Sequence, residues 1–255
     1  MKKVAVVTPI YKAVLNDSER FALQHGYAVL SAYEKIFVSP VNLEYQDTVR
    51  PDKVIRFPQH YFKNIAGYNR LMLSAHFYSQ FMEYEYILVF QPDAFIFRDE
   101  LIQWCAKGYA YIGAPWPGGS LIPPFQYYGT GYIAKYLPFI LKSRKVFLGN
   151  GGLSLRNVRA SLEILQKHRY VARFWTGNED AFWSYYTTLP GANYPVPEER
   201  DASRFSLELA AEQYIQANGG ELPFGCHGWE KYSAGFWSQI IFEAQGKVQL
   251  NGKNG

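Results

Sequence analysis

Residues 84–97 read YEYILVFQPDAFIF, an apolar run that meets Gln91, Pro92 and Asp93 before a second apolar run begins. Uninterrupted β-forming runs of this length are typical of strands that are buried on both faces. A carboxylate directly after such a strand has two explanations. Either it caps the turn or the helix expected near Asp99, or the strand holds it there to contact a ligand. Position alone fits both interpretations of Asp93.

Strand-like and helix-like patterns alternate over the first part of the chain. The strand-like runs are KKVAVVTPIY (2–11), IFVSP (36–40), DKVIRFP (52–58) and YILVF (86–90). The helix-like runs span 19–35, with Asp17 or Ser18 as the cap, and 67–84. This alternation predicts an α/β fold with a mostly parallel central sheet and helices on both faces. Ligands bind beyond the carboxyl ends of the strands in such sheets, where residues 8–11 and 91–93 fall.

The composition limits the class of protein. The 255 residues are 48% apolar and 18% aromatic, and the formal net charge is +4. This length allows one core or a core with a small appendage. The dispersed charge fits an anionic small molecule or a membrane headgroup region, and it argues against a nucleic-acid partner. The apolar run at the N-terminus stops at Thr8 and Pro9, too early for a signal peptide, so we expect a soluble cytoplasmic protein.

The two cysteines, Cys105 and Cys226, follow no metal-binding spacing. We expect two reduced thiols in a reducing compartment, with one disulfide as the alternative.

The sequence becomes rich in proline, glycine and aromatic residues after residue 113. Residues 115–124 hold four prolines and two glycines around Trp116, so we expect a long acceptor-side loop that continues to Tyr128. Residues 148–169 then predict a Gly-rich turn, a short strand and a helix that Asn157 caps. A further short helix is expected at 178–189, and residues 205–216 predict a helix or a strand leading into one.

Three short segments could carry chemistry, and each also has a plain structural explanation. GNGGLSL (149–155) could bring the backbone close to a ligand, or it could form an ordinary tight turn. GNED (177–180) places two acids at a helix start, where the helix dipole already stabilises negative charge. His227, within PFGCHGW (223–229), could bind a metal, although a lone histidine is usually structural.

Taken together, the order and spacing of these segments resemble the GT-A glycosyltransferases. The matching blocks are VVTPIY (6–11), FQPDAFIF (90–97), GNGGLSLRN (149–157), NEDAFWS (178–184) and GCHGW (225–229). The match covers residues 4–229 and is closest to a bacterial family of uncharacterised GT-A-like proteins with QTDAF, YIGAPW and NGGLSLR blocks. The resemblance implies one GT-A-like, Rossmann-like domain over 1–245. Its nucleotide-sugar-binding half would be 1–113, its acceptor-binding half 114–245, and 246–255 a flexible tail.

The resemblance further implies a nucleotide-diphosphate sugar, UDP-linked, as the donor. The residues that it places around the nucleotide and the diphosphate are Thr8, Pro9, Tyr11, Tyr68, Asn69, Arg70, Gln91 and Asp93. It makes Asp93 and His227 ligands of a divalent cation, Mn²⁺ or Mg²⁺. Gln91 stands where the D-x-D motif of the family has its first acid. Because a neutral amide ligates a cation only through its carbonyl oxygen, metal dependence stays open.

On the acceptor side, the resemblance makes Asp180 the general base of an inverting transfer, with Glu179 as its rival. The residues that it places along the transferred sugar are Trp116, Asn150, Gly151, Gly152 and Trp183. The acceptor would be an oligosaccharide or a lipid-linked glycan of a bacterial surface, such as capsule or lipopolysaccharide. Peripheral contact with the inner face of a membrane would follow, although no amphipathic basic helix stands out.

Two other functions remain open at this point. A sugar-1-phosphate nucleotidyltransferase shares the layout, but it would need a Gly-rich loop after the first strand, which VVTPIYKAVLND lacks. A non-catalytic carbohydrate-binding protein would account for the aromatic residues but not for acids at strand and helix ends. The glycosyltransferase interpretation requires that Asp93 and Asp180 converge on one cleft.

Overall fold

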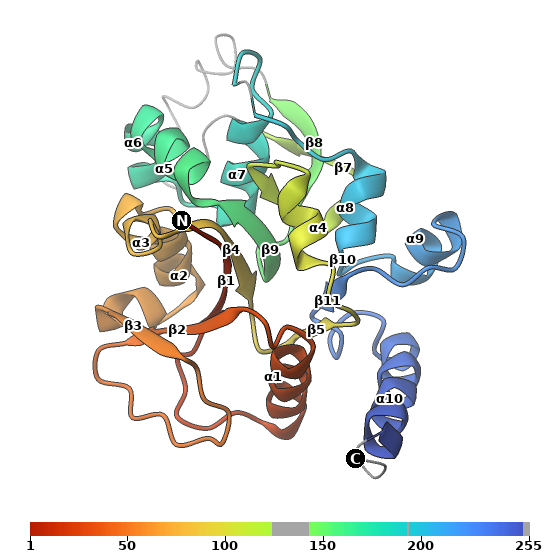
Figure 1. The fold of residues 1–255 in the computed structure, drawn as a ribbon. Helices are drawn as coiled ribbons and strands as arrows, with labels where there is room; N and C mark the ends of the chain where they lie inside the picture. Colours follow the sequence, from red (N-terminus) through yellow and green to blue (C-terminus); the bar gives the residue numbers. More distant parts are fainter. Residues whose placement is uncertain (124–142, 193, 252–255) are drawn as a thin grey trace.

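The computed structural model describes residues 1–123, 143–192 and 194–251, and its centre is a mixed sheet (Figure 1). In spatial order the strands of this sheet are β3 (Lys53–Phe57), β2 (Glu34–Pro40), β1 (Lys2–Pro9), β4 (Tyr84–Phe90), β9 (Leu153–Asn157) and β6 (Tyr111–Ile112). The first four are parallel, whereas β9 runs antiparallel to both β4 and β6. The predicted α/β fold with a mostly parallel sheet is confirmed.

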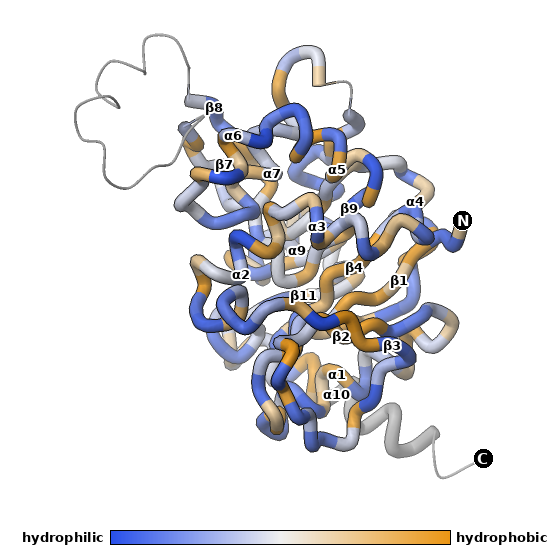
Figure 2. Tube along the Cα trace, turned by 90° about the vertical axis from the view of Figure 1, so that its left-hand side faces the viewer, coloured by the Kyte–Doolittle hydropathy of each residue, from blue (hydrophilic) through white to orange (hydrophobic). Residues whose placement is uncertain are grey.

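Helices cover both faces of this sheet because its central strands are apolar on both sides (Figure 2). In β1, Ala5 and Val7 belong to one apolar cluster and Val4 and Val6 to the other. The first cluster packs α2 (Ile65–Met72), α3 (Ala75–Ser79), α5 (Val158–Lys167), α6 (Arg169–Phe174) and α7 (Glu179–Thr187). The second packs α1 (Asp17–Val29) and α4 (Leu101–Ala106), and α8 (Glu199–Phe205) contributes to both. A 3-10 helix, η1 (Gln59–Phe62), precedes α2.

A smaller sheet joins distant parts of the chain. It consists of β10 (Ser206–Leu207), β11 (Gly225–His227) and β5 (Ala94–Ile96), with β11 antiparallel to β5. Its core includes Phe95 and Cys226, together with side chains of α9 (Ala211–Ala217) and α10 (Ala234–Asn251). Because His227 pairs with Ala94 in this register, the histidine is brought beside the turn that follows β4.

Several local expectations from the sequence need correction. Asn16, not Asp17 or Ser18, caps α1: its side chain accepts the N–H of Glu19, whose carboxylate accepts the N–H of Asn16. The expected helix at 67–84 splits into α2 and α3, because the Ser74 hydroxyl accepts the N–H of Phe77 and starts a new helix. Residues 205–216 form a short strand leading into a helix.

The expected loop at 115–124 is largely a strand. Residues Pro115–Ile122 form β7, which pairs antiparallel with β8 (Arg144–Leu148). Gly118 and Gly119, both with positive φ, lie where the register of this ribbon shifts, and only glycine adopts that conformation freely. Residues 124–128 of the expected loop lie outside the described residues.

Both cysteines are buried and unbonded, as expected. The helix α10 includes residues 246–251, so this part of the expected tail is helical. Among the described helices, none is long and apolar enough to span a membrane.

Candidate active site

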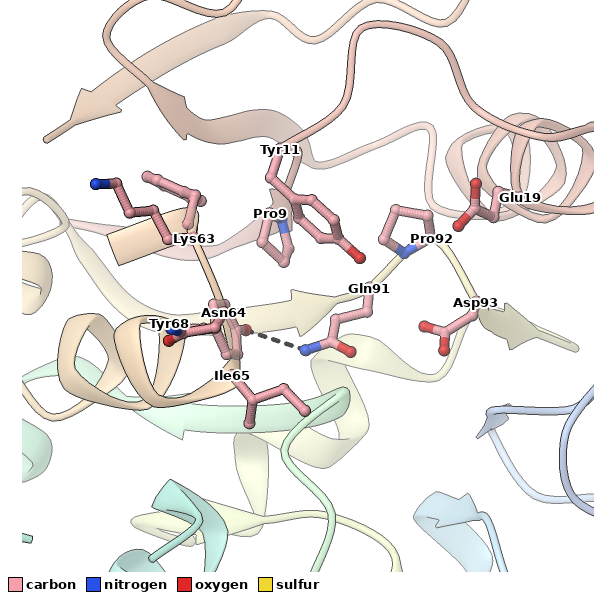
Figure 3. A pocket seen from close by; sticks show the side chains of 11 residues that line it. Pro9, Tyr11, Glu19, Lys63, Asn64, Ile65, Tyr68, Gln91, Pro92 and Asp93 are labelled. Atoms are coloured by element: carbon pink, nitrogen blue, oxygen red, sulfur yellow. Dashed lines mark hydrogen bonds between the residues drawn. The ribbon is translucent and has the colours of Figure 1, made fainter. Parts of the chain in front are cut away.

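A cavity of roughly 320 Å³ lies at the carboxyl ends of β1 and β4, which are neighbours in the sheet (Figure 3). It is lined by Pro9, Tyr11, Glu19, Phe62, Lys63, Asn64, Ile65, Tyr68, Gln91, Pro92 and Asp93. Five of the predicted donor-side residues are among them: Pro9, Tyr11, Tyr68, Gln91 and Asp93. Parallel strands place their carboxyl ends at one edge, so the cavity forms where the alternating pattern predicts a ligand site.

The remaining predicted donor-side residues lie elsewhere. Thr8 is fully buried, and its hydroxyl accepts a hydrogen bond from Tyr27 at 2.9 Å instead of bordering the cavity. Asn69 joins α2 to the start of α7, since its side-chain oxygen accepts the N–H of Glu179 at 3.3 Å. Arg70 is exposed at the end of α2 and does not line the cavity.

The turn after β4 holds Asp93 rigidly. The carbonyl of Gln91 accepts the N–H of Ala94, and the carbonyl of Asp93 accepts the N–H of Gly228. The helix α4 has its own acid at its start, because Asp99 accepts the N–H of Leu101 at 3.1 Å. Asp93 is therefore not needed as a helix cap, and its side chain is left 47% exposed beside the cavity.

His227 links Asp93 to two further polar side chains. Its Nε2 lies 3.2 Å from Asp93 Oδ1 and 3.1 Å from Gln91 Oε1, and its Nδ1 lies 3.2 Å from Glu208 Oε1. Gln91 donates its side-chain N–H to the Tyr68 hydroxyl at 3.1 Å, which leaves its oxygen to accept from His227 (Figure 3). Burial disfavours the imidazolium, but the bonds to Asp93 and Glu208 outweigh it and raise the pKa of His227 to about 9.

A cation held by Asp93 and His227 would have to displace the proton that His227 shares with Asp93. Both ring nitrogens of His227 face acceptor oxygens, and its Nε2 lies within 3.2 Å of both Asp93 Oδ1 and Gln91 Oε1, so loss of the Nε2 proton would leave three ligand atoms close together. Within the described residues, no group of three or more His, Cys, Asp or Glu side chains could hold a metal ion. The positive charges facing this region come from side chains: Lys63 lines the cavity, and Lys12 and Lys231 act electrostatically on Asp93.

The Gly-rich segment lies between His227 and the start of α7. A Cβ added at Gly152 would overlap the His227 ring, and one at Gly151 would overlap the Glu179 carboxylate. The carbonyl of Gly152 accepts the N–H of Gln91 at 2.9 Å, which fixes the segment to the turn after β4. Asn150 has φ 30°, and its side chain accepts the N–H of Gly152 at 2.7 Å. Glycine is thus required at 151 and 152 by close packing on both sides.

Glu179 is held in a buried ion pair. Arg156 donates to its two carboxylate oxygens at 2.7 Å and 2.9 Å, and to the hydroxyl of Tyr78 at 3.0 Å. The exposed fractions of the Arg156 and Glu179 side chains are 1% and 5%. Because both oxygens of Glu179 are bonded to Arg156, this carboxylate is not free to act as a base.

Asp180 follows Glu179 and has no such cation. Burial, and then the negative charge of Glu179, raise the pKa of Asp180 to about 7. Its Oδ1 accepts the N–H of Ala181 at 2.7 Å. Asp180 does not line the 320 Å³ cavity, but the charge of Glu208, the partner of His227, also acts on it. Asp93 and Asp180 therefore do not line the same cavity, and the Gly151–Gly152 segment lies between them.

The tryptophans differ in accessibility. Trp183 is 1% exposed and packs edge-on against Tyr78 and Phe182, so it belongs to the core and offers no face to a sugar. Trp116 is partly buried, and its ring packs against Gly149, beside the Gly-rich segment.

Two residues of this region were not predicted from the sequence. Glu208 reaches His227 only because β10 pairs with β11, and nothing in its local sequence marks it. Arg156 did leave a signal, since a charged residue within the apolar strand pattern of β9 needs a buried partner.

Among solved structures, the chain is similar to mouse xyloside xylosyltransferase 1, with 14% identity, a TM-score of 0.48, and coverage of 89% of this chain and 97% of that one. It is similar to the bifunctional glycosyltransferase WbbM, with 10% identity, a TM-score of 0.47, and coverage of 89% and 45%. It is also similar to the glycosyltransferase GlyE of Streptococcus pneumoniae, with 11% identity, a TM-score of 0.46, and coverage of 89% and 54%.

No curated protein sequence matches the chain. A family model described as "Protein of unknown function (DUF5672)" matches residues 52–227, well over half of the length. The chain belongs to this DUF5672 family.

Proposed function

We propose that this protein is a glycosyltransferase that moves a sugar from a UDP-linked donor to a hydroxyl of a surface-glycan acceptor, with inversion at the anomeric carbon. One observation carries the proposal: a carboxylate with a pKa near 7 lies across a two-glycine segment from a cavity at the carboxyl ends of β1 and β4. A displacement at a bound sugar needs the base within reach of the anomeric carbon, so in this proposal the donor sugar extends from the cavity past the Gly151–Gly152 segment to Asp180.

The cavity suits the nucleotide and diphosphate of the donor. Its volume is within the usual range for small-molecule sites. Tyr11 and Tyr68 offer flat surfaces to a base or a ribose, and Lys63 offers positive charge to the diphosphate, whereas Lys12 is paired with Glu19 of the cavity wall. We assign no step to a metal ion, because His227 is committed to Asp93, Gln91 and Glu208.

In the proposed reaction, Asp180 takes the proton of the acceptor hydroxyl as its oxygen bonds to the anomeric carbon. The bond between that carbon and the diphosphate oxygen breaks at the same time, and the diphosphate leaves with the electron pair. A carboxylate with a pKa near 7 is about half ionised at neutral pH and is a stronger base than an ordinary aspartate. Glu179 would instead position α7, since Arg156 occupies its oxygens.

The first test is a panel of nucleotide sugars, with and without Mn²⁺ or Mg²⁺, read by thermal shift and by slow donor hydrolysis. A ligand that binds only the native state raises the melting temperature, so a UDP-sugar should stabilise the protein. Stabilisation by free glycans alone would identify a carbohydrate-binding protein and contradict the proposal.

The second test uses Asp180→Asn, with the exposed Asp17→Asn as the matched control. Asp180→Asn should bind the donor normally and lose turnover by roughly 10²–10⁴-fold, the usual contribution of a general base. In the wild type, turnover should rise as the pH passes about 7, where Asp180 ionises. Retained turnover in Asp180→Asn would remove Asp180 from the role of base.

A further inference from the structure

The charge of this protein, which the overall composition suggests is dispersed, is in fact unevenly distributed along the chain. Residues 101–178 contain ten Lys and Arg but a single acid, Glu163, whereas the rest of the chain contains 16 Lys and Arg and 21 Asp and Glu. The modest net charge of +4 therefore hides a strongly basic segment. Such an asymmetry points to an anionic partner for one part of the molecule.

The fold gathers part of this segment at one end of the molecule. The helix α6 and the β7–β8 ribbon lie at the same end, with α7 between them, and a second direction of view shows the same end (Figures 1 and 2). Contacts support this placement, since Trp175, next to α6, packs on Phe182 of α7, and Ser184 of α7 donates to the carbonyl of Leu148 in β8. We call α6 and the β7–β8 ribbon the basic-aromatic surface.

Its cations have no carboxylate partners. Lys145, Arg169 and Arg173 are exposed, and none of them forms an ion pair with another described residue. The same holds for Lys167, which ends α5 just before this surface. Glu163, the one acid nearby in sequence, accepts a hydrogen bond from Tyr194. Residues 188–197, which connect α7 to α8, carry no charge in their sequence. The helix α8 packs against the ribbon and brings acids close to it, but its Asp201 pairs with Lys107 and its Glu199 accepts from Tyr214, so the cations of the surface stay unpaired within the described part of the chain.

Its apolar side chains are unusually exposed. Leu121 is 70% exposed, Tyr170 67% and Phe174 49%. Cations lie over these aromatic rings: Arg169 is 4.7 Å from the centre of Tyr170, and Arg173 is 5.6 Å from that of Phe174. Long cationic side chains beside exposed aromatic rings suit an interface that is apolar on one side and charged on the other.

We propose that the basic-aromatic surface docks this protein on an anionic phospholipid bilayer. The cations would meet lipid phosphates, and Leu121, Tyr170 and Phe174 would enter the headgroup and upper acyl region. A soluble polyanion would use the cations but would gain nothing from the exposed apolar groups, which is why a bilayer is the better match. The strand β8 leads directly into the Gly149–Gly152 segment, so docking here would place the bilayer next to the acceptor side of the proposed site.

Vesicle sedimentation with the full chain tests this proposal. Wild-type protein should bind phosphatidylcholine vesicles that contain about 30 mol% phosphatidylglycerol, bind much less to pure phosphatidylcholine, and dissociate as salt rises from about 0.1 M to about 0.5 M. Arg169→Gln/Arg173→Gln should lower the partition coefficient roughly 30-fold, because each cation contributes about 1 kcal/mol near an anionic surface. The control is Arg50→Gln/Arg98→Gln, which removes the same charge outside this surface and should change binding less than about threefold.

A second variant separates lipid from other polyanions. Tyr170→Ser/Phe174→Ser keeps every charge and should lower vesicle binding about tenfold or more, while leaving binding to heparin, a soluble polyanion, unchanged. Absence of binding to anionic vesicles, or equal loss in the control variant, would overturn the proposal. Vesicle binding that is unaffected by Tyr170→Ser/Phe174→Ser would also overturn it and would reassign the surface to a soluble anionic glycan.

Discussion

Two charged clusters flank the Gly151–Gly152 segment, and they differ mainly in their access to water. On one side, Arg156 and Glu179 are 1% and 5% exposed and satisfy each other through two hydrogen bonds. On the other side, Asp93 is 47% exposed at the wall of a cavity, while His227 behind it is 13% exposed. The sealed cluster has no capacity left for a ligand, whereas the open one presents a carboxylate to whatever enters the cavity. The comparison shows that burial decides whether a charged side chain is satisfied within the protein or left accessible at a cavity.

The largest effect is expected from breaking the sealed cluster. Arg156→Met leaves the Glu179 carboxylate buried without a partner, and we expect the free energy of unfolding to fall by about 3–5 kcal/mol. Urea denaturation measures this loss. The double variant Arg156→Met/Glu179→Leu should recover most of it, because it removes both charges. Arg159→Met, which changes an exposed arginine of α5, is the control. A loss below about 1 kcal/mol would mean that water reaches Glu179.

The pH dependence of the free energy of unfolding tests the environment of Asp180, next to the sealed cluster. Its carboxyl keeps the proton to about pH 7 in the native state but loses it near pH 3.8 when unfolded, so between these values the native state binds more protons. Stability from this group is therefore lost as the pH rises. Relative to Asp180→Asn, the wild type should lose about 2–4 kcal/mol from about pH 4 to pH 7, measured by urea denaturation at each pH. Parallel pH profiles for the two proteins would contradict the raised pKa.

A smaller effect is expected from crowding the segment between the clusters. Gly151→Ala places a methyl group against the Glu179 carboxylate and Arg156, and overpacking of this kind costs about 1–3 kcal/mol. Gly235→Ala in α10 is the matched control, since a Cβ there meets no atom within 4 Å. The difference between their thermal melting temperatures measures the close packing. Equal melting temperatures would show that the segment accommodates an added methyl group without overpacking.

The smallest effect on stability is expected in the open cluster. His227→Gln removes a cation whose pKa rise alone corresponds to roughly 3 kcal/mol. Because its partner Asp93 is half exposed and can be hydrated, solvent screening reduces the expected loss to about 1 kcal/mol. Because the pKa of His227 is raised from 6.5 to about 9, this contribution is complete below pH 6.5 and disappears as the pH passes 9. Denaturation of both proteins at about pH 6 and pH 10 checks this. A loss as large as that of Arg156→Met would erase the distinction between the clusters.

The donor side of the site could be anticipated further than the acceptor side. Pro9 and Asp93 follow strands that the apolar runs mark clearly, and parallel pairing places strand ends together. Thr8 is an exception. Side chains alternate between the two faces of a strand, so the Thr8 side chain points into the core, where its hydroxyl accepts a hydrogen bond from Tyr27. Trp183 fails as a sugar platform because α7 is buried on all sides, which a short helix with few charges does not reveal by its periodicity.

The sequence by itself determined the alternation of strands and helices up to β4, the parallel core of the sheet and the position of acids after β4 and at the start of α7. These follow from local patterns, because burial on two faces and helix capping are written in neighbouring residues. Only the tertiary structure decided that Glu208 meets His227, that Arg156 claims Glu179, and that Asp180 is left with a raised pKa. Those outcomes depend on which distant side chains share a low-dielectric interior, and no local pattern encodes that choice.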